Sequence, residues 1–154
     1  MYFAVDDRHR LAFFRFVSAE LSDEQWMFYV DGFVRYASME GGPYAIVAES
    51  ELGSAMPNAK WRQRFADAGA RVHSDAVFVL ITKSAVARGI VTAVNWLRPF
   101  RFHYGVVASR QEATRFVCGY RPDPGVSAAL EAAFLRAPSA PVGRDGRWAA
   151  APSS

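Results

Sequence analysis

The residues best able to perform covalent or metal chemistry are few in this chain of 154 residues. Its three histidines, His9, His73 and His103, lack the spacing of His-x-x-x-His or Glu-x-x-His that directs two ligands onto one metal. We interpret His103 as a residue of a sheet face or pocket. The single Cys118 follows an apolar pair that supplies neither positive charge nor a base to activate a thiol. The sequence therefore predicts no metal site and a cysteine of the core.

Carboxylates are the other candidates for acid and base chemistry. Asp6, Asp7, Glu49, Glu51 and Asp123 fall in predicted turns or at strand ends, where solvation is the usual state. The chain has no Gly-x-Ser-x-Gly elbow, no Walker loop and no Gly-x-Gly-x-x-Gly fingerprint. We predict no catalytic residue and no cofactor. An enzyme stays an alternative only if residues distant in sequence converge in the fold.

Composition favours one compact domain. Hydrophobic residues make up 51% of the chain and charged residues 21%, which is typical of a globular protein. We expect a single domain over residues 1–136 and a flexible tail rich in Pro, Ala and Ser over 137–154. The net charge of +3 comes from scattered arginines, which does not indicate a specific nucleic-acid partner. The lone cysteine, the acidic start and the absence of an apolar run of roughly 20 residues predict a cytoplasmic protein without a membrane span.

The elements that would position these residues alternate along the chain. Capping-box spacing at Ser22 to Gln25 and at Ser109 to Glu112 predicts two helix starts, and Ser84 can cap a third helix. Short β-prone runs predict strands at residues 2–5, 11–18, 44–49, 75–82 and 101–107. Strands that alternate with helices, after an opening hairpin, indicate an α/β fold with a mixed sheet of about five strands and four or five helices.

This order resembles the STAS-like family, in its divergent branch related to anti-sigma factor antagonists. Four segments between residues 11 and 118 carry the resemblance: the strand at 44–49, the helix containing 61–67, the segment 87–93 and the Glu112-Ala113 helix start. The resemblance implies STAS-like topology and a non-enzymatic protein that binds other proteins, in the better-known branch under control of a phosphorylated serine.

That serine lies at the start of the helix after the third strand, and the corresponding segment here, 50–57, lacks the Asp-Ser-Ser-Gly element. Ser50 and Ser54 are the nearest substitutes, because a phosphate near a helix N-terminus is favoured by the helix dipole. The alternative is that both are ordinary loop serines.

Two groups of residues indicate recognition. Phe28, Gly32 and Tyr36 follow one another at one-turn spacing, opposite the predicted core stripe of their helix. Either a partner covers them or another helix of the same domain does. Trp148 lies in the predicted tail, where its ring would be exposed unless it docks.

A ligand pocket is the third possibility. Trp61, Trp96 and Tyr104 could enclose an apolar pocket, with Arg62 or Arg101 at its rim, for a lipid or another amphipathic anion. The primary prediction is a regulatory or scaffolding protein that binds a protein partner or a second copy of itself. A protein that binds a small ligand is the alternative.

Overall fold

The computed structural model describes residues 1–38 and 42–137. These residues form one five-stranded sheet in the order β1-β2-β3-β4-β5. The strands are β1 (Tyr2–Asp6), β2 (Leu11–Phe16), β3 (Ala45–Ser50), β4 (Val77–Thr82) and β5 (His103–Val107). The β1 strand runs antiparallel to β2, and the other neighbouring pairs are parallel. The predicted α/β fold with a mixed sheet is confirmed.

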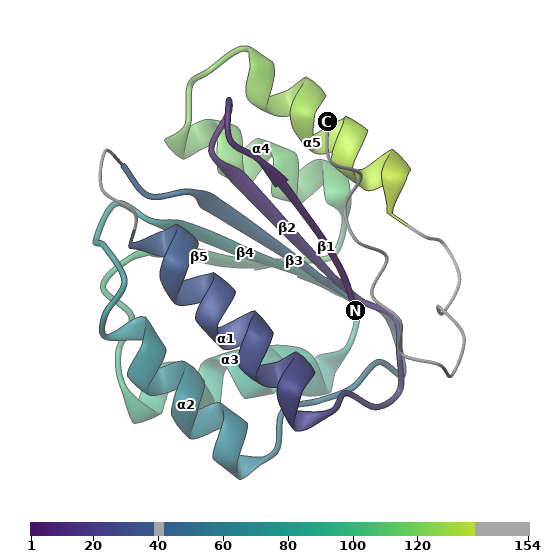
Figure 1. The fold of residues 1–154 in the computed structure, drawn as a ribbon, viewed down its shortest axis with the longest axis vertical. Helices are drawn as coiled ribbons and strands as arrows, with labels where there is room; N and C mark the ends of the chain where they lie inside the picture. The colour runs from purple at the N-terminus through teal and green to yellow at the C-terminus, as the bar shows by residue number, and fades with distance from the viewer. Residues whose placement is uncertain (39–41, 138–154) are drawn as a thin grey trace.

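Five helices cover the two faces of this sheet. They are α1 (Asp23–Ala37), α2 (Ala59–Gly69), α3 (Ala85–Leu97), α4 (Arg110–Tyr120) and α5 (Gly125–Arg136). Helices α1, α2 and α3 connect the parallel strands in turn and lie together on one face, while α4 and α5 lie on the other (Figure 1). Right-handed crossovers explain why these three helices share one face. Each new parallel strand is added at the same edge of the sheet, so each connecting helix must pass over the same face.

The predicted helix starts are confirmed at three serines. Ser22 and Ser109 each form a capping box, and Ser84 accepts a hydrogen bond of 3.2 Å from a backbone N–H in the first turn of α3. The start of α2 has a different cap. The helix begins after Asn58, whose side chain caps it, and Pro57 lies just outside. An amide oxygen can accept the free N–H groups of a helix start, which defines the boundary more strongly than the tolerance for proline does.

Both faces of the sheet are apolar, which explains the uninterrupted apolar runs of the inner strands. Phe13 and Phe14 are neighbours on β2 and point to opposite faces of the sheet, and both side chains are buried. Phe14 packs on Tyr29 of α1 at 4.8 Å between ring centroids, and Phe13 packs on Phe134 of α5 at 5.2 Å. The fold therefore contains two cores, one beneath α1 to α3 and one beneath α4 and α5.

The predicted interface on α1 makes an internal contact. The Phe3 ring of β1 lies 5.4 Å from that of Phe28 and 5.7 Å from that of Tyr36. A Cβ atom at Gly32 would lie 3.1 Å from the Phe14 ring, so the glycine allows the helix to approach β2 closely. The edge hairpin of the sheet, and not a second helix, packs against this face. Phe28 is still 39% exposed, so a partner at this face stays a prediction.

Two predictions concern the C-terminal tail and the possibility of a membrane-spanning helix. Trp148 and the rest of residues 138–154 lie outside the described residues, so the docking of the tail stays a prediction. Over 1–38 and 42–137, the helices are too short or too polar to cross a bilayer.

Candidate functional site

The residues predicted to enclose a ligand pocket do not gather around one cavity. Trp61 is buried between α1 and α2, where its indole N–H donates to Asp23 at 2.9 Å. Arg62 of α2 donates to the carbonyl of Pro57 at 3.2 Å and so fixes the segment before the helix. Trp96, on α3, points away from the core and is 80% exposed. The pocket prediction is wrong for these residues, because helical spacing did not show which side of α3 packs.

The other two predicted pocket residues lie near Trp96 along the chain and form part of an exposed surface. We define the α3–β5 surface as Trp96, Leu97, Phe100, Arg101 and Tyr104. Leu97 is 57% exposed and Tyr104 is 39% exposed. The half-buried Phe100 lies edge-on to Tyr104, with ring centroids 5.0 Å apart. A turn after α3 supports this arrangement, because the Phe100 N–H donates to the side chain of Asn95 at 2.9 Å.

Exposed aromatic residues also lie on the side of β5 that faces α4. The His103 ring stacks on Tyr120 of α4 with centroids 4.2 Å apart, and Tyr120 is 46% exposed. Within the described sheet, β5 is an edge strand that pairs with β4 alone. Exposed edge strands with apolar flanks are common docking sites for other chains.

The charge at this surface is positive. Arg98 lies 3.6 Å from Asp67, and both side chains are about half exposed, so water screens their attraction. Arg101 is exposed and forms no ion pair within 1–38 and 42–137. The result is one group of exposed rings beside an available guanidinium.

The candidate regulatory serines lie in a buried turn. Ser54 is 6% exposed, and its hydroxyl donates to the Glu51 carbonyl at 2.8 Å. The Ser50 hydroxyl lies 2.7 Å from that of Ser54, so both are held within the turn. Helix α2 begins only after Asn58, so a phosphate at Ser54 would not lie at its N-terminus. The prediction that Ser54 substitutes for the phosphorylated serine is wrong in geometry, because its turn precedes the helix.

Two of the carboxylates considered for acid and base chemistry, Glu49 and Glu51, are paired with arginines. Arg110 donates to both oxygens of Glu49, at 2.8 Å each, and Arg15 reaches Glu49 at 3.3 Å. Arg15 also pairs with Glu51. The hydrogen bonds from Arg110 to Glu49 raise the pKa of Arg110 above its ordinary value. These pairs join the carboxyl ends of β2 and β3 to the start of α4, which is a structural role.

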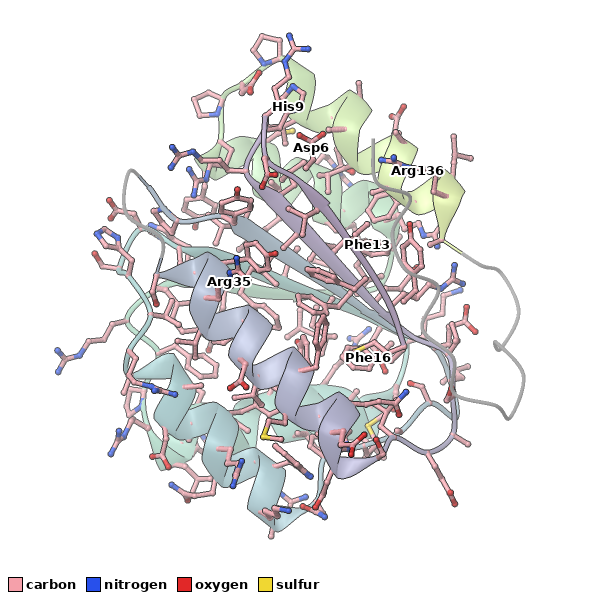
Figure 2. The ribbon with its side chains drawn as sticks, viewed as in Figure 1. Asp6, His9, Phe13, Phe16, Arg35 and Arg136 are labelled. Atoms are coloured by element: carbon pink, nitrogen blue, oxygen red, sulfur yellow. The ribbon has the colours of Figure 1, made fainter. Side chains whose placement is uncertain are left out.

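The histidines are far from one another along the fold. His9 donates its backbone N–H to Asp6 at 3.0 Å, and its ring lies 3.2 Å from the same carboxylate, at the tip of the β1–β2 hairpin (Figure 2). His73 accepts the Asp75 N–H in a turn before β4. In the part of the chain that the structure describes, no three His, Cys, Asp or Glu residues gather as metal ligands.

A cavity that the sequence did not predict lies between α1, α2, α3 and the sheet, with a volume of about 110 Å³. Rings from α1, α2, β4 and the segment before β5 form most of its wall. Spacing within a helix or strand could not show that rings from these separate elements leave room between them. Tyr29 and Ser50 both contribute a hydroxyl to the lining, and the Ser50 hydroxyl lies 2.7 Å from that of Ser54.

Comparisons with family models, curated proteins and solved structures gave no match. The STAS-like resemblance accordingly stays a prediction.

Proposed function

We propose that this chain is a non-enzymatic, STAS-like interaction protein of the cytoplasm that binds an acidic protein partner on its α3–β5 surface. The observation that carries the proposal is the 80% exposure of the Trp96 ring. A large aromatic ring in water gains free energy when another surface covers it, and aromatic residues with arginine are the residue types most enriched in interfaces.

The neighbours of Trp96 support a specific site. Leu97 and Tyr104 add apolar area next to it, and β5 offers the backbone groups of an edge strand. Arg101 favours a partner with carboxylates, which would reach a guanidinium with no competing ion pair in the described residues. The same positive charge disfavours a symmetric contact between two copies, since it would bring identical arginines together.

Replacing Trp96 tests the proposal directly. In Trp96→Ala we expect binding to weaken by about 2 kcal/mol, roughly thirtyfold, which is the usual cost of removing a central aromatic anchor. The matched control is Leu135→Ala on α5, whose side chain is 86% exposed on the other face of the sheet. Affinity purification of both variants and the parent from the native cell, with quantitative mass spectrometry, compares what each retains.

The expected result is an acidic protein that the parent and Leu135→Ala retain and Trp96→Ala loses. Its binding should weaken as salt rises from low to physiological concentration, because exposed charges are screened within about 10 Å at 0.1 M. Identical sets of retained proteins for the three chains would refute the proposal. Light scattering adds a second check, since a dimer that dissociates in Trp96→Ala would make the partner a second copy.

A further inference from the structure

The cavity beneath α2 has an apolar and uncharged wall. Its lining includes Phe33, Phe65, Phe78, Ile90 and Phe102, and no Asp, Glu, Lys, Arg or His of the described residues contributes to it. An anion placed there would lose its water and gain no opposite charge, which costs several kcal/mol. The amphipathic anion predicted from the sequence therefore does not fit this cavity, and a neutral molecule does.

The cavity arises from the way the helices stack. Helix α2 packs mainly against α1 and α3 and less against the sheet, so side chains alone must fill the space beneath it. Phe65 reaches into that space from α2, while the small Ala55 and Ala87 leave part of it open. Protein interiors are normally filled to crystal density, so an apolar hollow of this size, partly open to solvent, needs an explanation.

Tyr29 supplies one polar group to this apolar wall. Its side chain is 6% exposed and lies 4.8 Å from Phe16 and 5.1 Å from Phe65, ring to ring. In the described residues its hydroxyl has no hydrogen-bond partner. A bound acceptor would give this hydroxyl a hydrogen bond inside an apolar site, where such a bond is stronger than in water. Burial raises the pKa of Tyr29, so the group keeps its proton and remains a donor.

We propose that this cavity binds a neutral compound with a single aromatic ring, whose polar atom accepts a hydrogen bond from the Tyr29 hydroxyl. The volume of about 110 Å³ sets the size. An apolar protein cavity of about 150 Å³ holds benzene, so one ring is the scale that fits here, with a substituent toward the open side. Surrounding rings favour an aromatic occupant by edge-to-face contacts. The site lies beside the docking surface: Phe100 belongs to both, whereas Trp96 and Tyr104 do not line the cavity.

Phenol and toluene are a matched pair of probes, since they share one shape and differ in the oxygen. We expect phenol to bind the parent more tightly than toluene does, measured by shifts of amide signals in two-dimensional NMR titrations. In Tyr29→Phe, which keeps the ring, phenol should bind roughly two- to tenfold more weakly, the worth of one neutral hydrogen bond, and toluene should bind as before. An equal affinity of phenol for parent and Tyr29→Phe would refute the role of the hydroxyl.

A second pair of variants tests the cavity itself. Ala87→Leu places a larger side chain into the cavity from α3, and Ala85→Leu makes the same change at an exposed position of the same helix. Binding of both probes should be lost in Ala87→Leu and retained in Ala85→Leu, with NMR spectra showing that both variants are folded. The proposal is overturned if neither probe binds the folded parent at millimolar concentration, or if both bind Ala87→Leu unchanged.

Discussion

Glu49 is the residue whose loss of charge should be felt most strongly in the stability of the fold. Its side chain is 12% exposed and lies between Arg15, which is 7% exposed, and Arg110. The substitution Glu49→Gln keeps the shape and removes the negative charge that both arginines face. Arg15 cannot regain water without moving β2, and its Nε atom already lacks a hydrogen-bond partner.

The magnitude follows from burial. Removing one partner from a buried ion pair typically costs 3 to 5 kcal/mol, because the remaining charge stays buried. We expect about 3 kcal/mol for Glu49→Gln, toward the lower end, since Glu51 still faces Arg15 and Arg110 is partly exposed. That loss is a large part of the 5 to 15 kcal/mol that usually stabilises a domain. The matched control is Asp67→Asn, which breaks the exposed pair with Arg98 and should cost less than about 1 kcal/mol.

Urea unfolding followed by circular dichroism measures both variants against the parent. The midpoint should fall clearly in Glu49→Gln and barely in Asp67→Asn, with an unchanged dependence on urea. If the free energy of unfolding falls by the same small amount in the two variants, the arginines around Glu49 are solvated and the reasoning from burial fails.

Three further predictions concern other parts of the fold. Burial raises the pKa of Tyr44 to about 12, against an ordinary 10.0, so its contribution to stability is complete below pH 10 and is lost as pH rises through 12. Burial raises the pKa of Tyr29 as well, so ultraviolet difference spectra should show two tyrosines that ionise late and with unfolding. Gly89→Ala should stabilise α3 by about 0.5 to 1 kcal/mol, since its new methyl group meets open space. Gly105→Ala on β5 should destabilise by about 1 to 3 kcal/mol, because its Cβ would lie 2.8 Å from a ring of α4; thermal unfolding distinguishes the two signs.

Local chemistry made much of the architecture predictable. The reciprocal bonds at Ser22 and Ser109 involve residues three apart, so a short stretch of sequence contains the whole interaction. The continuous apolar runs of β3 and β4 likewise indicated inner strands covered on both faces. The site was less predictable because it depends on contacts between distant segments. Glu49 and Arg110 are 61 residues apart, and no spacing rule joins them.

The hairpin shows how a correct pattern can miss the neighbour that packs against it. Phe28 and Tyr36 do lie on one face of α1, as their spacing predicted, yet that face meets Phe3 of β1. An antiparallel edge strand lies beside the first parallel strand, so it extends the sheet under the outer side of α1. The sequence pattern contained no information on how far the sheet reaches.

Helix α3 explains why the docking surface and the cavity both escaped a sequence pattern. Its apolar residues exceed what one face can bury, since Val86, Ile90, Val94 and Leu97 recur at spacings of three or four residues. Val94 is buried and Ile90 lines the cavity, whereas Val86 is 64% exposed and Leu97 is 57% exposed. When a helix is apolar on more than one side, periodicity shows several possible stripes and tertiary packing selects one. The proposed partner would bind the apolar side of α3 that the fold leaves exposed. That side can be recognised only once the buried side is known.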